Sequence, residues 1–219
     1  MDKSIKNIAE TVQQMLKNAE GGHDWLHINR VYKNAMQIYN KEKKGDLYIL
    51  QLAALLHDIA DAKFNNGDEA IASELALKVM LGNSVPENVI NEVIKIIENM
   101  SYRSRYDNSG FTSIEMDIVR DADMLDALGA IGIARAFNYG GFKNRPLYDP
   151  EGKPQKITSK DQYIRNDGPT IHHFFEKLIK LKDLMQTETG KEMAKERHEY
   201  LVTFINQFYD DIGEDKPDI

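Results

Sequence analysis

Apolar residues recur at helical spacing over most of residues 2–137 and 170–209. Residues 138–169 break this rhythm, because they hold too many turn-forming residues for a helix. The turn formers are Gly140, Gly141, Pro146, Pro150, Gly152, Pro154, Gly168 and Pro169. The pattern predicts an all-α protein with one long irregular loop, 138–169, which serves as a lid or pocket wall or is a surface excursion without function. We expect residues 1–219 to form one domain whose acidic end, 210–219, is frayed.

The most apolar helical segment is residues 47–60, where apolar side chains face nearly every side. Such a segment is typical of a helix buried at the centre of a bundle. His57 and Asp58 stand at its C-terminal end. Because a buried polar or charged pair is costly unless it is hydrogen-bonded or metal-bound, this pair indicates a site.

A second helix is expected over residues 24–40. Its core positions, at helical spacing, are Trp25, Ile28, Val31, Ala35 and Ile38. His27, Arg30 and Asn34 fall on an adjacent stripe. A potential metal ligand and a cationic group therefore share one face of this helix.

Residues 114–137 predict a further helix of the same kind. Its expected core positions are Ile118, Leu125, Leu128, Ile131 and Ile133. Asp123 and Asp126 lie three residues apart on one side. Asp126 either orients a ligand histidine or joins an ion pair on the helix surface.

His27, His57, Asp58 and Asp123 could together close around one divalent metal ion, each motif being supplied by its own helix. Imidazole nitrogens and carboxylate oxygens suit Mn, Mg, Co, Ni, Fe or Zn, and the chain has no cysteine to offer a softer ligand.

The order of a first histidine, an adjacent His-Asp pair and a later aspartate resembles the HD-domain superfamily of metal-dependent phosphohydrolases, in particular its small single-domain bacterial members. The resemblance extends to the segments DADMLDALGAIGIARAF from residue 121, RPLYDP from 145, HFFEKL from 173 and TETGK from 187. It implies that His27, His57, Asp58 and Asp123 are the metal ligands. Asp123 is preferred over Asp121, the alternative at that position, because ligands of the superfamily stand in an Ala-Asp-x-Leu context.

The same resemblance implies a single metal ion, since superfamily members with more ions use extra histidines and none lies between Asp58 and Asp123. Relatives of the alarmone-hydrolase type carry His-Asp-x-x-Glu-Asp, whereas this chain keeps only Asp61 of the two later acids. On a continuing helix Asp61 would point toward the site, so it is the candidate that orients or deprotonates water. Arg30 and then Lys63 are the candidate cations for substrate phosphate.

Other side chains are weaker candidates. Further cations are Arg103, Arg105, Lys143 and Arg145, and rings that could stack on a base are Tyr102, Tyr106, Phe111 and Tyr148. These rings are more simply core or rim residues. Among the remaining histidines, His172, His173 and His198 are interpreted as helix-stabilising groups, and His23 as a turn residue or pocket-wall group.

The net charge of −7 disfavours binding to nucleic acid, which relies on basic surface. The N-terminus lacks the apolar core of a signal peptide, and no apolar run approaches the roughly 18 residues of a membrane span. Together with the absence of cysteine, this predicts a cytoplasmic protein that acts neither on membranes nor on nucleic acid.

The chain is therefore predicted to cleave a phosphomonoester or phosphoanhydride bond of a small phosphorylated molecule by metal-activated water. The preference for a nucleotide is what the resemblance implies. The alternative is a regulatory module that binds a metal or nucleotide without turnover. The complete ligand set and Asp61 favour the enzyme.

Overall fold

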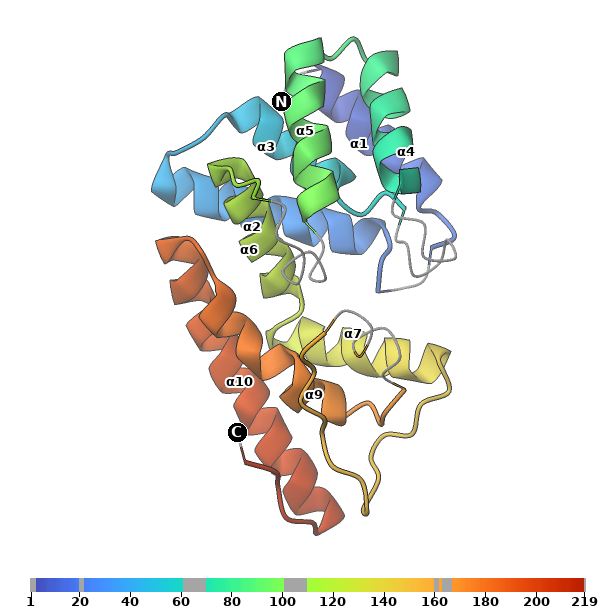
Figure 1. Cartoon of the computed structure of the whole chain (residues 1–219), viewed down its shortest axis with the longest axis vertical. Coiled ribbons are helices and arrows are strands. Elements are labelled where there is room, and N and C mark those ends of the chain that lie inside the picture. Colours follow the sequence, from blue (N-terminus) through green and yellow to red (C-terminus); the bar gives the residue numbers. More distant parts are fainter. Residues whose placement is uncertain are drawn as a thin grey trace. The chain divides into compact units, whose positions relative to one another are not determined.

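The computed structural model describes residues 3–19, 22–60, 70–100, 110–159, 162 and 167–218. Within these residues every regular element is helical, which confirms the all-α prediction (Figure 1). The chain divides into two compact units, Met1–Ala122 and Asp123–Ile219, and each is described by itself. That the whole chain is one domain stays a prediction. Among the described residues, no helix combines the length and apolar character needed to cross a bilayer.

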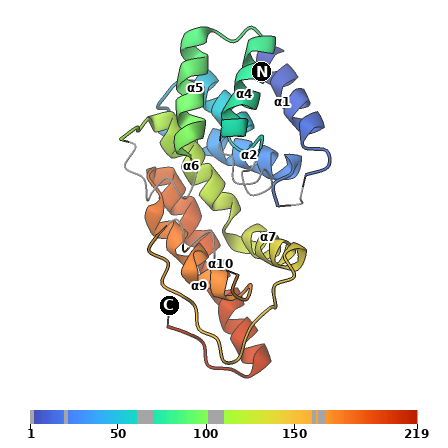
Figure 2. The ribbon, with the colours of Figure 1, turned by 45° about the vertical axis from the view of Figure 1, so that its right-hand side comes forward.

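The first unit is built around helix α3 (Leu47–Leu56). Its other helices are α1 (Lys3–Met15), α2 (Trp25–Glu42), α4 (Ala70–Gly82), α5 (Glu87–Asn99) and the larger part of α6 (Ile114–Asp126). Helix α3 packs against α1, α2 and α5, and α4 lies beside α5 (Figures 1 and 2). Because α3 is covered by these helices, six of its ten residues are buried, as its apolar sequence predicted.

Helix α3 ends earlier than the sequence suggested. Asp46 caps its start by accepting hydrogen bonds from the amides of Tyr48 and Ile49. The helix stops at Leu56, and the Ile59 amide donates to the Leu56 carbonyl in a tighter turn. The prediction that the helix continues through Ala60 is therefore wrong. His57 lies at the C-cap, with Asp58 in the turn that follows.

Helix α2 matches its prediction closely. Four of the five expected core residues, Ile28, Val31, Ala35 and Ile38, are buried, and Trp25 is half-buried. The helix begins after Asp24, whose carboxylate accepts a hydrogen bond from the backbone amide of His27.

The second unit contains the end of α6, then α7 (Gly129–Phe142), α9 (His172–Glu176), the 3₁₀ helix η3 (Leu178–Leu184) and α10 (Glu188–Ile212). Helix α10 packs against α7 and η3 (Figures 1 and 2). Four phenylalanine rings join α7, α9 and α10, with centroid separations of 5.6–6.0 Å: Phe137, Phe174, Phe204 and Phe208. The helical part of α10 reaches three residues into the predicted tail.

Residues 114–137 form two helices where one was predicted. Helix α6 ends at Asp126 and α7 starts at Gly129, which has a left-handed φ of +66°. Glycine adopts this conformation at little cost, so the chain turns there and the helical phase restarts. The predicted core residue Ile131 is consequently 44% exposed, whereas Ile118, Leu125 and Leu128 are buried as expected.

The predicted loop begins later than residue 138, because α7 continues to Phe142 and includes Gly140 and Gly141. Gly140 is buried, and a Cβ atom there would overlap the Thr170 side chain. This glycine therefore permits a close approach and does not end the helix. The segment after α7 is anchored through hydrogen bonds from the amides of Thr170 and Ile171 to the carbonyls of Pro146 and Leu147, at 2.9 and 3.0 Å.

Gly140→Ala is expected to lower the free energy of unfolding by about 1–3 kcal/mol, because the added methyl group overlaps Thr170. Gly141→Ala is the matched control: nothing lies within 4 Å of its Cβ position, so better helix propensity should raise stability by roughly 0.5–1 kcal/mol. Urea unfolding of the two variants measures both effects. Equal stabilities would show that the contact with Thr170 is not restrictive.

The buried imidazole of His172 makes the stability of the protein depend on pH. His172 is 5% exposed, and burial lowers the pKa of its imidazole although Glu176 and Asp149 oppose the shift. Between this lowered pKa and the unfolded value of about 6.5, the unfolded chain holds a proton that the folded protein lacks. The contribution of neutral His172 to the free energy of unfolding is therefore complete above about pH 6.5. It is lost as the pH falls through the pKa of the folded state.

Urea unfolding of wild type and His172→Gln between pH 5 and 8 tests this pH dependence. The stability difference between the two proteins should change with pH below about 6.5 and be constant above it. His198, whose pKa is also lowered, by burial and by Lys182, is present in both proteins, so the comparison isolates His172. A difference that does not vary with pH would contradict the prediction.

Candidate metal centre

His27 lies in the first turn of α2 and is 1% exposed. Its backbone amide donates to Asp24 Oδ1 at 3.0 Å, so the N-cap that starts the helix also fixes the turn bearing this imidazole. The sequence Asp24-Trp25-Leu26-His27 therefore combines a helix start with a buried potential ligand.

His57 lies at the C-terminal end of α3, in the same unit. Its Nδ1 is 3.1 Å from the Ala54 carbonyl oxygen, and its ring centroid is 5.5 Å from that of His27. When Nδ1–H donates to Ala54, the neutral tautomer keeps a lone pair on Nε2. A backbone carbonyl that orients an imidazole in this way is common at metal sites.

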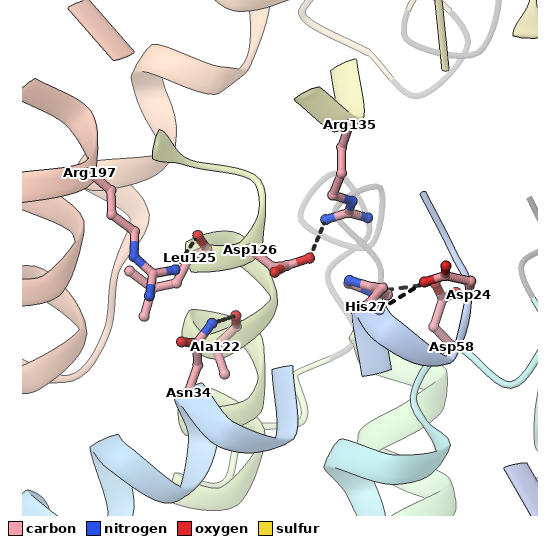
Figure 3. Close-up of polar contacts among 9 residues, drawn as sticks. All are labelled: Asp24, His27, Asn34, Asp58, Ala122, Leu125, Asp126, Arg135 and Arg197. Atoms are coloured by element: carbon pink, nitrogen blue, oxygen red, sulfur yellow. Dashed lines mark hydrogen bonds and ion pairs between the residues drawn. The ribbon is translucent and has the colours of Figure 1, made fainter. Parts of the chain in front are cut away.

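Asp123 lies on α6 directly after Ala122, the last residue of the first unit. The Ala122 carbonyl oxygen accepts a hydrogen bond from Asn34 Nδ2 of α2 at 3.2 Å (Figure 3). Because Ala122 and Asp123 are consecutive residues of one helix, a bond that restrains the backbone of Ala122 also restrains Asp123. One ligand atom each of His27, His57 and Asp123 lies within 4.8 Å of the others.

These three side chains fit a divalent metal ion. Two imidazole nitrogens and a carboxylate oxygen are ligands of first-row metals. Atoms bound to one ion at about 2.1 Å lie roughly 3–4 Å apart, so small side-chain movements would bring the group to bonding distance.

Asp58 lies beside this group. Its Oδ2 is 3.7 Å from Nε2 of His27, as drawn in Figure 3. Asp58 is thus placed next to one of the three grouped side chains. Asp121, the alternative to Asp123, is fully buried and does not belong to the group formed by the described residues.

The predicted catalytic residues are placed only in part. Arg30 is half-buried on α2, three residues after His27. Asp61 and Lys63 lie outside the described residues, as do the weaker candidates Tyr102, Arg103, Arg105 and Tyr106.

Lys143 and Arg145 have local aromatic contacts in the second unit. The Lys143 ammonium lies 5.8 Å from the Tyr139 ring centroid and 5.5 Å from that of Phe142, and the Arg145 guanidinium lies 5.7 Å from Tyr139. Arg145 Nη2 is also 3.5 Å from Asp167 Oδ1. These contacts provide a structural reason for both cations.

Two arginines missed by sequence reasoning hold the C-terminal end of α6. Arg135 Nη1 of α7 lies 2.9 Å from Asp126 Oδ2, and Arg197 Nη1 of α10 donates to the Leu125 carbonyl oxygen at 2.6 Å (Figure 3). Asp126 is only 2% exposed, so its ion pair is buried and not on the helix surface. Separations of nine and 72 residues leave no periodic signal that could have revealed these contacts.

Comparison with known proteins identifies the family. The HD-domain model matches residues 25–128, a range that includes His27, His57, Asp58 and Asp123. The protein YpgQ of Bacillus subtilis is 39% identical over 211 residues, which cover 96% of this chain and 94% of YpgQ. The chain belongs to the HD-domain family. HD domains bind divalent metals, in agreement with the His/Asp group of this HD-domain protein.

Solved structures agree with this assignment over nearly the whole chain. A Lactobacillus plantarum protein superposes with a TM-score of 0.86 at 32% identity, covering 98% of this chain and 99% of its own. An HD-superfamily hydrolase from Bacillus thuringiensis gives 0.71 at 40% identity, with coverages of 96% and 97%. YpgQ in complex with ADP gives 0.72 at 36% identity, with coverages of 93% and 97%. This HD-domain protein therefore has the fold of HD-superfamily hydrolases.

Arg135→Met is expected to lower the free energy of unfolding by about 2 kcal/mol, because the buried Asp126 carboxylate loses its ion pair with Arg135 and keeps only its other interactions, such as that with Arg197. The loss should be below the roughly 3–5 kcal/mol of a fully buried pair, since Arg135 keeps some contact with water. Denaturant unfolding measures it, and adding Asp126→Asn should recover part of the loss.

The control for this variant is Lys191→Met, which breaks an exposed pair with Glu188 and should cost less than about 0.5 kcal/mol. Similar stabilities for Arg135→Met and Lys191→Met would show that the buried pair contributes no more than a surface one.

Proposed function

We propose that this HD-domain protein is a metal-dependent phosphohydrolase that cleaves a phosphomonoester or phosphoanhydride bond of a small phosphorylated molecule, with a nucleotide as its substrate. The observation that carries the proposal is the grouping of His27, His57 and Asp123 within 4.8 Å. The HD-superfamily hydrolase of Bacillus thuringiensis, 40% identical to this chain, supports the reaction class.

In this proposal His27, His57, Asp58 and Asp123 hold one divalent ion. When bound, such an ion supplies Lewis-acid polarisation of a phosphoryl oxygen and lowers the pKa of water. The protein keeps the ligands in place: Asp24 fixes the turn of His27, and the Ala54 carbonyl orients the ring of His57.

The remaining roles belong to charged side chains near the ligands. Arg30 lies almost one helical turn after His27, and its guanidinium is suited to gripping phosphate oxygens through two hydrogen bonds. Asp61 is proposed to orient or deprotonate the attacking water, and Lys63 to offset substrate charge. The roles of Asp61 and Lys63 rest on the sequence alone.

A nucleotide is the preferred substrate class because YpgQ, which matches this chain over almost its full length, was crystallised in complex with ADP. ADP contains both a phosphoanhydride and a phosphomonoester, so either bond is a candidate. The products distinguish them: from ADP, phosphate and AMP report cleavage of the phosphoanhydride, whereas pyrophosphate and adenosine report cleavage of the ester bond to ribose.

The proposal is tested by measuring phosphate and pyrophosphate release from nucleotides, deoxynucleotides and sugar phosphates, each with Mn, Mg, Co, Ni, Fe or Zn. Asp58→Ala should reduce turnover by more than about 100-fold, because even residues that only orient metal ligands change activity 10- to 100-fold. Asp210→Ala, an exposed aspartate on α10, should leave turnover unchanged. Removing the metal with a chelator should abolish turnover, and adding it back should restore it.

The second candidate function, a binding module without turnover, predicts a different result. Metal would bind stoichiometrically and depend on Asp58, but no substrate and metal combination would be hydrolysed faster than by Asp58→Ala. That outcome would contradict the hydrolase proposal and favour a regulatory protein with an HD fold.

A further inference from the structure

Helices α2 and α6 each carry a proposed metal ligand, and a buried side chain connects them. Asn34 lies on α2 seven residues after His27, which is two helical turns and therefore nearly the same face. Its Nδ2 donates to the Ala122 carbonyl oxygen, one residue before Asp123, at 3.2 Å (Figure 3). The bond thus joins the two helices next to Asp123 on α6 and two turns from His27 on α2.

The bond is buried, since Asn34 is 8% exposed and Ala122 is fully buried. Placing an amide on the inner face of α2 costs free energy unless its polar atoms are satisfied. The neighbouring inner positions of α2, Val31, Ala35 and Ile38, are apolar and bury without this cost. Packing alone does not explain an asparagine here.

A side-chain bond to a backbone oxygen restrains position in a way that apolar packing does not. A helical carbonyl oxygen already accepts one hydrogen bond from the amide four residues later. It can accept a second bond, and Asn34 donates that bond. The bond has a preferred length and direction, so it resists sliding or rotation of α6 against α2. Metal ligands must be held within roughly 0.5 Å of their bonding positions, which makes such a restraint useful beside Asp123.

We propose that Asn34 is a positioning residue of the metal centre: its hydrogen bond to the Ala122 carbonyl sets the register of α6 against α2 and so holds Asp123 opposite His27. This inference rests on the proposed metal site. Asp24 restrains the same centre at His27, since its cap fixes the turn bearing this imidazole. The Asp24 bond restrains His27 and the Asn34 bond restrains Asp123, in each case through the backbone.

The test is the affinity of the purified full chain for Mn²⁺, measured by calorimetry, together with urea unfolding of the chelator-treated protein. Asn34→Asp replaces the donating NH₂ by an acceptor, and Asn34→Leu removes hydrogen bonding while keeping the same branched skeleton of heavy atoms. Asn34→Ser, which is too short to reach the carbonyl, is the milder variant if the other two fold poorly. Each should weaken Mn²⁺ binding by about 10- to 100-fold.

Asn83 offers the matched control, because its Nδ2 donates to the Val79 carbonyl oxygen at 2.9 Å after α4. The corresponding Asn83 variants remove the same kind of bond and should change metal-free stability without changing Mn²⁺ affinity. Asn34→Gln, which keeps the donating amide, should recover part of the affinity. If the role of Asn34 is purely structural, its variants should change the free energy of unfolding and leave the affinity for Mn²⁺ unchanged.

The outcomes separate the two proposals. Mn²⁺ affinities of all Asn34 variants within about twofold of wild type would overturn the positioning role and leave the hydrolase intact. Weakened binding with no turnover in wild type would support the positioning role and overturn the proposed function. If wild type binds Mn²⁺ no more tightly than Asp123→Ala does, the metal centre is wrong and the role of Asn34 falls with it.

Discussion

The burial of His27, with the other proposed ligands half-buried around it, is the constraint on which this site depends. His27 is nearly inaccessible to water, and His57 and Asp58, both half-buried, follow a helix whose last seven residues are nearly all buried. Groups of this kind are costly to bury unless neighbouring atoms satisfy them. Two imidazoles and a carboxylate within 4.8 Å form a set that a divalent cation would satisfy together.

Helix ends and backbone bonds provide the precision that this group requires. His27 lies just inside the start of α2, and His57 lies just past the end of α3. Backbone groups without helical partners are concentrated at helix ends, so caps such as Asp24 and tight turns such as that after Leu56 set local geometry there. Asp123 lies inside α6, and the bond from Asn34 to the Ala122 carbonyl restrains that helix instead.

In the second unit, side chains from other helices likewise satisfy polar groups at the end of a helix, here at the junction of α6 and α7. Arg135 pairs with the buried Asp126, and Arg197 donates to the Leu125 carbonyl, which lies near the C-terminal end of α6. Cations are favoured at such an end, where carbonyl oxygens lack helical partners. Gly129 permits the left-handed turn, and a Cβ there would lie 3.3 Å from Arg197 Cβ, so the turn and the arginine are closely packed.

The sequence by itself determined the all-α class, the buried character of α3, the core stripe of α2 and the resemblance to HD-domain proteins, because helical periodicity and short motifs are local in the chain. Only the tertiary structure decided that α3 ends at Leu56, that the chain turns at Gly129 and that Gly140 belongs to a helix. Glycine is needed at position 140 because a Cβ atom would overlap Thr170, thirty residues away. Asp126 forms its ion pair with Arg135 of another helix. Close approaches and buried ion pairs depend on residues distant in sequence, which no local pattern can specify.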